Sequence, residues 1–359
     1  MCKGFKFSGV GSGLKKNGEK DLGLIFSETP GSVAGVFTRN QIKAAPVLLD
    51  MQRITSGTCQ AVIVNSGNAN ACTGEEGMSM ARAVSGLTAQ ALGIDEELVQ
   101  VASTGVIGQP LPIERVTGAV PALVADLSVD GFERLAAAIM TTDTVPKLAS
   151  RRINLDGKPV TITGICKGSG MIHPDMATML AFFTTDVSIR PPLLRRTLVA
   201  AVGESLNRIT VDGDTSTNDA CVLLASGKSG VSIDDLDSDA GRAFQQALSD
   251  VCYQLARSIV LDGEGATKLV EIVVETAASE DEARQVAFTV AHSPLVKTAL
   301  FASDPNWGRI LAAVGRAGLT ELDIDAVQVW LDDTRIVCDG GRDPAYTEQA
   351  GKAVLSKPA

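Results

Sequence analysis

The stretch KGSGMIHPDMATMLAFF, residues 167–183, joins a loop containing glycine and methionine to a short, continuous apolar run. The run TMLAFF, residues 178–183, has the length and composition of a buried strand. Its first residue is Thr178, and a β-branched residue that only fills a strand is the ordinary interpretation of such a position. The pattern on either side of the run indicates which fold class this strand belongs to.

Strands and helices alternate along the chain. Short apolar runs at residues 33–37, 61–65 and 98–102 predict buried strands. A helix is predicted between the last two runs, opened by a capping box of Thr73 and Glu76. This alternation is typical of an α/β fold.

The remaining elements follow the same pattern. Helices are predicted at 112–125 and at 131–140, the second with Asp130 as its N-cap. A hairpin that turns at Asp156-Gly157 leads into residue 167. Beyond residue 183 the pattern predicts a helix from Pro191, strands at 221–226 and 268–275, helices at 241–259, 280–290 and 306–317, and a hairpin turning at Asp332-Asp333.

Composition and charge exclude several classes of function. The 359 residues carry 32 Lys or Arg and 42 Asp or Glu, a formal net charge of −10, so nucleic acid and anionic membranes are poor partners. No apolar run is long enough to span a membrane, and no signal segment opens the sequence, so we expect a cytoplasmic protein. The seven cysteines have no metal-binding or disulfide spacing, which predicts reduced, mostly buried thiols rather than a disulfide frame or a zinc site. We expect neither a metal nor a cofactor.

Familiar ligand-binding and catalytic patterns are incomplete. SGKSG, residues 226–230, lacks the first glycine of a P-loop. The acidic loop VDGDTSTNDA, residues 211–220, lacks the glycine and glutamate of an EF-hand and predicts a structural loop whose side chains cap nearby backbone groups. With only His173 and His292 in the chain, a His-rich metal site or a Ser-His-Asp triad is unfavourable.

Thr178 has a chemical alternative to filling a strand. At a strained peptide bond its hydroxyl can attack the carbonyl of Ala177 and shift the acyl group from nitrogen to oxygen. Hydrolysis of that ester cuts the chain and leaves Thr178 as a new N-terminus. Its α-amine, with an ordinary pKa near 7.7–8.0, can then act as a general base at neutral pH.

Seven segments carry a resemblance to a known family. They are KGSGMIHPDMATMLAFF, NSGNANACTG, ASTGVIG, MTTDTVPK, NRITVDGDTSTNDA, LDGEGATK and FASDPNWGRI. Together they closely resemble the ornithine acetyltransferases of arginine biosynthesis, also called glutamate N-acetyltransferases. The segments follow the family's order from about residue 5 to residue 317, which is nearly the whole chain.

The resemblance implies a self-processing acyltransferase. Cleavage between Ala177 and Thr178 would give two fragments that stay together, commonly as a heterotetramer of two copies of each. Thr178 would take acetyl from N-acetylornithine and pass it to glutamate, and some members of the family also accept acetyl-CoA.

Individual site residues are also implied by the resemblance. Thr104 and Gly105 of STGVIG match the oxyanion hole, through a hydroxyl and a backbone N–H. Thr141, Lys167 and Glu264, together with Thr178, match substrate-binding positions. A cation and an anion suit an amino-acid derivative with a second charged end.

This chain departs from the family's pattern in two places. It has His173 and Asp175 where the family usually has Ala and Asn, close to the scissile bond. It stops at Ala359, before strands that in the family carry an Asn and a Thr or Ser that bind substrate. Two alternatives therefore stay open: a related self-cleaving amidohydrolase or aminopeptidase, and an inactive, C-terminally truncated homologue.

By resemblance, the fold is an αββα sandwich shared with certain self-cleaving aminopeptidases, plus a smaller C-terminal α/β region. The residues alone predict only an α/β fold. We expect three segments: 1–190, which holds the cleavage site; 191–278, which completes the core; and 279–359, the C-terminal region.

Overall fold

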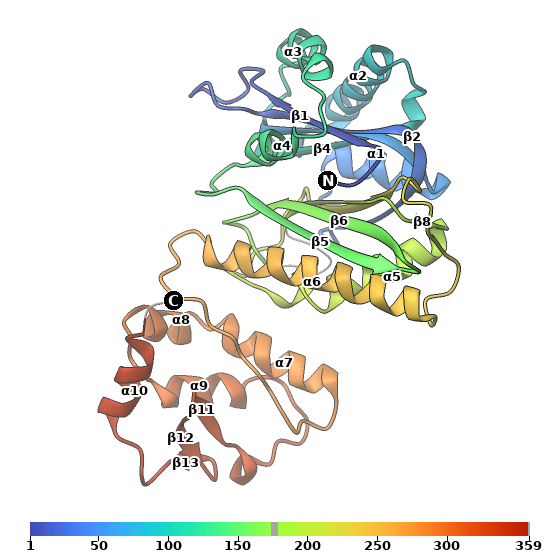
Figure 1. Ribbon diagram of the computed structural model, residues 1–359. Coiled ribbons are helices and arrows are strands. Elements are labelled where there is room, and N and C mark those ends of the chain that lie inside the picture. Colours follow the sequence, from blue (N-terminus) through green and yellow to red (C-terminus); the bar gives the residue numbers. More distant parts are fainter. Residues whose placement is uncertain (174–178, 358–359) are drawn as a thin grey trace. The chain divides into compact units, whose positions relative to one another are not determined.

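The computed structural model describes residues 1–173 and 179–357 (Figure 1). The chain divides into two compact units, Met1–Glu264 and Gly265–Ala359, and each is described here by itself. The finer division into three segments stays a prediction. None of the helices in the described parts of the chain combines the length and apolar character needed to cross a bilayer.

One large sheet organises the first unit. Its described strands run in the order β4-β3-β2-β9-β7-β6-β5, with β1 paired to β2. The strands are β1 (Phe5–Val10), β2 (Leu22–Phe37), β3 (Thr58–Asn68), β4 (Val99–Val106), β5 (Lys147–Leu155), β6 (Lys158–Lys167), β7 (Leu180–Thr185) and β9 (Ala220–Ala225); β8 (Ser188–Ile189) and β10 (Ser232–Ile233) form a separate pair.

The long strand β2 belongs to two parts of this sheet. Its first half pairs with β1 and β3, its second half pairs with β9, and the register with β3 shifts between Phe26 and Gly31. Pro30 lies in this irregular stretch, where its missing N–H costs no ladder hydrogen bond. The sheet therefore divides into a half with β1, β3 and β4 and a half with β5, β6, β7 and β9.

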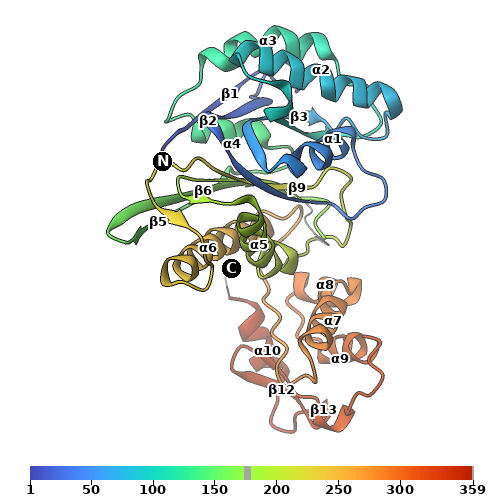
Figure 2. The same cartoon turned by 90° about the vertical axis from the view of Figure 1, so that its right-hand side faces the viewer.

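Helices cover the outer face of each half-sheet (Figures 1 and 2). One apolar cluster joins the first half to α1 (Ala45–Arg53), α2 (Gly74–Leu92) and α3 (Ile113–Ala125). Another joins the second half to α5 (Pro191–Gly203) and α6 (Asp239–Leu261). A third cluster lies between the two halves and includes Phe132 and Leu135 of α4 (Phe132–Ile139). These layers confirm the αββα sandwich.

Strand β7 shows why residues 180–183 are apolar without interruption. Leu180 and Phe182 pack in the cluster between the half-sheets, whereas Ala181 and Phe183 pack against α5 and α6. All of its residues are buried. A central strand covered on both faces needs apolar side chains at every position rather than at alternate ones.

Most elements that the sequence predicts are present. The helices predicted at 112–125, 131–140, 241–259, 280–290 and 306–317 correspond to α3, α4, α6, α7 (Glu280–Ala291) and α9 (Trp307–Gly315). Asp156 and Gly157 both have positive φ, 52° and 78°, as a two-residue hairpin turn requires. Gly93, also with positive φ, ends α2.

Three local predictions are wrong. The Thr73 side chain makes no capping bond to α2 and instead donates to Asn70 Oδ1. The N-cap of α4 is Gly131, not Asp130. Residues 268–275 form no strand, because an alternating apolar pattern makes a strand only where a neighbouring strand pairs with its backbone.

The second unit is a smaller α/β region, as expected. Its described helices are α7, α8 (Pro294–Phe301), α9 and α10 (Glu348–Leu355). A sheet of β11 (Val329–Leu331), β12 (Thr334–Cys338) and β13 (Gly341–Arg342) accompanies them. The predicted hairpin is present, with Asp332 and Asp333 between the paired residues Leu331 and Thr334.

Candidate functional site

A cleft of about 820 Å³ opens in the first unit, where several strands end or begin. It lies at the ends of β3, β4 and β6 and at the starts of β7 and β9, and a loop before β2 forms part of its wall. Five of the predicted site residues line it: Thr104, Gly105, Thr141, Lys167 and Glu264. Thr178 and Ala177 lie outside the described residues, as does Asp175.

Close contact between β3 and β4 shapes the part of the cleft around Gly105. The two strands pair in parallel, and their register shifts next to Gly67. Gly105 has φ of +132°, and a Cβ atom there would lie 2.4 Å from the carbonyl carbon of Gly67. Only glycine accepts both constraints. The backbone conformation of this corner therefore requires glycine at position 105, directly after Thr104.

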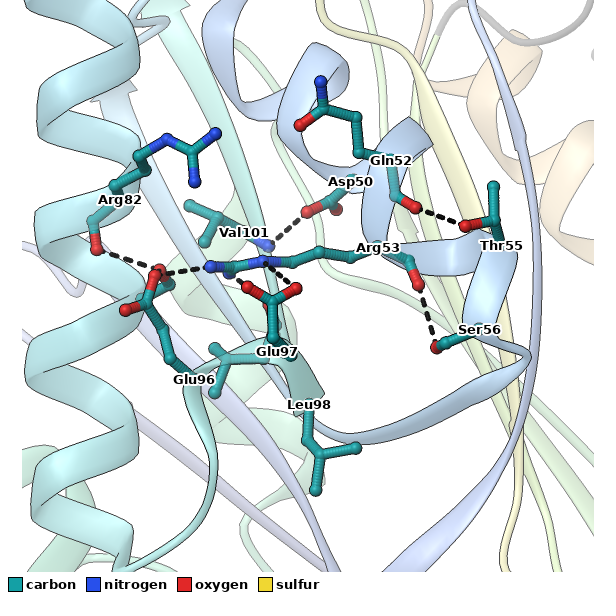
Figure 3. Close-up of polar contacts among 12 residues, drawn as sticks. Asp50, Gln52, Arg53, Thr55, Ser56, Arg82, Glu96, Glu97, Leu98 and Val101 are labelled. Atoms are coloured by element: carbon teal, nitrogen blue, oxygen red, sulfur yellow. Dashed lines mark hydrogen bonds and ion pairs between the residues drawn. The ribbon is translucent and has the colours of Figure 1, made fainter.

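Helix α1 holds the beginning of β4 (Figure 3). Asp50 accepts a hydrogen bond of 2.8 Å from the N–H of Val101, and Arg53 donates to the carbonyl of Val99 at 2.8 Å. Arg53 also pairs with Glu96. Burial raises the pKa of Asp50 well above 3.8, so burying this carboxyl costs folding free energy. Its hydrogen bond fixes β4, the strand that carries Thr104.

Lys167 brings three predicted site residues together. Its Nζ donates to Thr104 Oγ1 at 3.1 Å and to Thr141 Oγ1 at 3.2 Å. An ammonium can only donate, so both hydroxyl oxygens accept, and each hydroxyl proton stays available to another acceptor. Burial lowers the pKa of Lys167, although the carboxylates of Asp143 and Asp219 oppose the shift.

A buried ion-pair cluster fixes the segments around Lys167. Lys147 Nζ lies 2.6 Å from both Asp143 Oδ1 and Asp262 Oδ2. Asp143 also accepts hydrogen bonds from the N–H groups of Thr141, at 3.0 Å, and Gly168, at 2.7 Å. Lys147 therefore connects Asp143, which binds the backbone at Thr141 and Gly168, to Asp262 at the end of α6. These contacts fix the segments that surround the Lys167 side chain.

Glu264 follows closely after that cluster. Its N–H donates to the carbonyl of Ser169 at 2.9 Å, and Ser169 Oγ donates to the carbonyl of Asp262 at 2.7 Å. A Cβ atom on Gly170 would lie 2.4 Å from Glu264 Oε2. The carboxylate therefore lies against the glycine loop that follows Lys167, and a cation and an anion belong to the same cleft.

Asp219, at the start of β9, is a further acidic group of the cleft. It is buried, and its Oδ2 has no hydrogen-bond partner among the described residues. Burial raises its pKa well above 3.8, against the lowering effect of Lys167. A buried carboxyl oxygen without a partner costs folding free energy and is typical of a functional site.

The loop that leads toward residue 174 is tied to the acidic loop 211–220. Asp212 accepts from the N–H groups of Met171, at 2.7 Å, and Ile172, at 3.0 Å. His173 Nδ1 lies 3.1 Å from the carbonyl of Gly213. Asp212 thus has the backbone-capping role predicted for this loop. Among the described residues, no group of three or more His, Cys, Asp or Glu side chains could hold a metal ion.

Sequence reasoning missed several residues of this site. Asp143, Lys147 and Asp262 lie in segments that carry the resemblance, but no short motif joins residues more than a hundred positions apart. Lys15 lines the cleft from a loop that has no recognisable pattern. Only the folded chain brings these charges together.

The ArgJ family model matches residues 6–359 of this chain. "Arginine biosynthesis bifunctional protein ArgJ" of Geobacter sulfurreducens is 51% identical over 99% of this chain and 90% of that protein. The protein of the same name from Methylococcus capsulatus is 52% identical over 99% of this chain and 87% of that protein. A crystal structure titled as the ArgJ protein of Bacillus halodurans is 43% identical over 49% of this chain and 92% of that one, with a TM-score of 0.47. By its match over nearly the full length, this chain belongs to the ArgJ family.

Proposed function

We propose that this chain is a self-processing glutamate N-acetyltransferase of arginine biosynthesis, which moves acetyl from N-acetylornithine to glutamate. The observation that carries the proposal is the cleft in which Lys167 binds the hydroxyls of Thr104 and Thr141. Such a cleft offers a cation for a substrate carboxylate and free hydroxyl protons for a developing oxyanion. Membership of the ArgJ family supports an acyltransferase rather than the amidohydrolase alternative.

The first proposed step is self-processing. The hydroxyl oxygen of Thr178 attacks the carbonyl carbon of Ala177, the Ala177–Thr178 amide bond breaks, and an ester forms. Water then hydrolyses the ester, which leaves a carboxylate on Ala177 and a free α-amine on Thr178. Asp212 accepts hydrogen bonds from the N–H groups of Met171 and Ile172, which fixes the backbone at these two residues of the same loop.

The second proposed step is acetyl transfer. The Thr178 oxygen attacks the acetyl carbonyl of N-acetylornithine, its proton passes through the α-amine to the leaving nitrogen, and ornithine departs. The amine of glutamate then attacks the acetyl ester, and the Thr178 hydroxyl is restored. The same residue accepts and releases the acetyl group, so a ping-pong reaction is expected.

Each cleft residue has a proposed role in that cycle. Thr104 donates its free hydroxyl proton, and Gly105 its N–H, to the oxyanion of the tetrahedral intermediate. Lys167 binds a substrate carboxylate, with Thr141 beside it. Glu264 binds the side-chain ammonium of N-acetylornithine.

Intact-mass measurement tests self-processing. The wild-type protein should give fragments Met1–Ala177 and Thr178–Ala359, whereas Thr178→Ala should stay a single chain. Thr117→Val, an exposed change on α3, should be processed like the wild type. A folded wild-type protein that remains one species would rule out this step.

Transfer from N-acetylornithine to isotope-labelled glutamate tests the reaction class. Labelled N-acetylglutamate and free ornithine are expected in equal amounts. Free acetate without acetylglutamate would instead identify the amidohydrolase. Absence of any product from a processed protein would favour the inactive homologue.

Two finer proposals rest on the family resemblance. Acetyl-CoA is a second donor, and acetylglutamate formed from acetyl-CoA and glutamate would support it. The two fragments assemble as a heterotetramer, for which native mass spectrometry should give two copies of each. A heterodimer would contradict that assembly but would leave the proposed acetyl transfer unaffected.

A further inference from the structure

The loop of residues 11–20 forms one wall of the cleft. Leu14, Lys15 and Glu19 are among its cleft-lining residues. Asp21 is fully buried behind the loop and accepts hydrogen bonds from the N–H groups of Ser12, at 2.5 Å, and Lys15, at 2.8 Å. These bonds fix the backbone of the loop at Lys15, so its side chain starts from a defined position.

Lys15 is a largely buried cation whose ion-pair partner is an exposed side chain. The Lys15 side chain is 11% exposed, and its Nζ lies 4.0 Å from a carboxylate oxygen of Glu19. Its Nζ donates to the carbonyl of Lys20 at 2.9 Å, which uses one of three N–H donors. Burial lowers the pKa of Lys15, with Glu19 and Asp21 opposing the shift. An anion that entered the cleft would meet an ammonium that is already partly removed from water.

Lys15 also lies next to the corner where Thr104 and Gly105 stand. Its Cγ is 3.4 Å from the position of a Cβ atom on Gly67. Gly67 pairs with Gly105 in the register of β3 and β4. The cleft therefore has two lysines near this corner: Lys167, through its bond to Thr104, and Lys15, through its contact with Gly67.

The proposed substrates differ in charge, and one lysine cannot satisfy both. N-acetylornithine has one carboxylate and an ammonium, which Lys167 and Glu264 complement. Glutamate has two carboxylates, and the second would meet the like charge of Glu264 if it took the place of that ammonium. We propose that Lys15 binds the second carboxylate of the acceptor and so selects an acidic amino acid. This inference rests on the proposed function and adds acceptor specificity to it.

Lys15→Met tests this role by comparing two acceptors. Glutamine has the shape of glutamate without the second negative charge. In the wild-type enzyme, glutamate should be the better acceptor, and Lys15→Met should lower its kcat/KM by about 10- to 100-fold, the loss of one charge-assisted hydrogen bond. The kcat/KM for glutamine and the KM for N-acetylornithine should change by less than about 3-fold.

Two further variants separate specificity from folding. Lys15→Arg keeps the charge and should retain the preference for glutamate. Lys6→Met removes a half-exposed lysine of β1 outside the cleft and should leave both acceptors unchanged. Equal losses for glutamate and glutamine in Lys15→Met, or no loss for either, would overturn the proposal.

The failure of this inference differs from a failure of the proposed function. If the wild-type protein transfers no acetyl group, the proposed function fails, and calorimetry still tests Lys15. Wild-type protein should then bind glutamate more tightly than glutamine, and Lys15→Met should bind the two alike. Equal binding of both ligands by the wild-type protein would reject the role of Lys15.

Discussion

Thr104 contacts the ammonium of Lys167 and is also the proposed hydrogen-bond donor to the oxyanion. Its hydroxyl oxygen accepts from Lys167, so its proton is left to donate elsewhere. The hydroxyl of a threonine rotates freely, so on its own its proton has no fixed orientation. The buried ammonium of Lys167 supplies that orientation, which makes Thr104 the residue where an activity assay is most informative.

Replacing Thr104 with valine should remove the donor while keeping the shape of the side chain. We expect kcat for acetyl transfer to fall by about 10²–10³, because charge on the carbonyl oxygen develops only in the tetrahedral state. The KM for N-acetylornithine should change little. Steady-state kinetics on processed protein measures both, with Thr117→Val as the control; an unchanged kcat would remove Thr104 from the oxyanion hole.

Gly105 should not tolerate a side chain. Gly105→Ala places a Cβ atom 2.4 Å from the carbonyl carbon of Gly67 at φ of +132°, and we expect a loss of about 2–4 kcal/mol in the free energy of unfolding. Gly118→Ala on α3 is the matched control, because its Cβ atom would meet nothing within 4 Å. That change should stabilise by about 0.5–1 kcal/mol. Urea unfolding compares the two, and equal effects would contradict the close approach at Gly105.

The pairing of α1 with β4 shows how one element positions another. β4 stands at the edge of the sheet, so none of the described strands pairs with the outer side of its backbone. Asp50 and Arg53 supply the missing acceptor and donor at Val101 and Val99 (Figure 3). A helix thus replaces a strand as the partner of this edge.

Arg53→Ala should loosen that edge. The Arg53 side chain is only 2% exposed, and its loss leaves the carbonyl of Val99 without this donor and Asp50 without a nearby cation, so we expect a cost of about 2–4 kcal/mol. Arg82→Ala removes an exposed arginine from α2 and should cost less than about 0.5 kcal/mol. Chemical denaturation measures both changes, and equal costs would show that the buried contacts of Arg53 do not hold β4.

The buried cluster around Lys147 should make stability depend on pH. Burial opposes ionisation of Asp143, but the charges of Lys167 and Lys147 outweigh it and hold the pKa of Asp143 below 3.8. The cluster therefore stabilises the fold fully above that ordinary value and loses its effect as the pH falls through the lower, folded-state pKa.

Lys147→Met tests this dependence. At pH 7 it should cost about 3–5 kcal/mol, because Asp143 and Asp262 stay buried without their ion pair. The difference from wild type should shrink below pH 4, where the carboxylates become protonated. Lys158→Met, at an exposed lysine of β6, should show no such trend in urea unfolding. A constant difference from pH 7 to pH 3 would contradict the ion pairs.

The chain as a whole consists of two compact units, Met1–Glu264 and Gly265–Ala359. Residues 266–275, at the start of the second unit, belong to no helix or strand. The alternating apolar residues of this segment include Val273, which is 67% exposed. Backbone without regular hydrogen bonding opens at low cost in free energy.

Limited proteolysis should therefore cut this segment first. A glutamate-specific protease should cleave after the exposed Glu271 or Glu275 before it cleaves after Glu133, which is also exposed but lies in α4. The Thr178→Ala protein keeps the assay free of self-processing. Mass spectrometry of the early fragments identifies the sites, and cleavage at Glu133 first would show that 266–275 is the better protected segment.

Local sequence was enough to locate most elements and the family. The apolar run at 180–183, the turn at Asp156-Gly157 and the helix end at Gly93 depend on neighbours within a few residues, so they were predictable. The capping box at Thr73 and the strand at 268–275 were not, because a competing bond to Asn70 and a missing strand partner are not local properties.

The arrangement of the cleft was decided only by the folded chain. The sequence motifs identified Thr104, Thr141, Lys167 and Glu264 as site residues. Only the folded chain places the hydroxyls of Thr104 and Thr141 at the ammonium of Lys167. Lys147 joins Asp143, from its own segment, to Asp262, more than a hundred residues further along the chain. Lys15 contacts Gly67 although no motif includes both. A burial cost or an ion pair depends on which groups meet in space. This depends on how β2 joins the two halves of the sheet rather than on any one stretch of sequence.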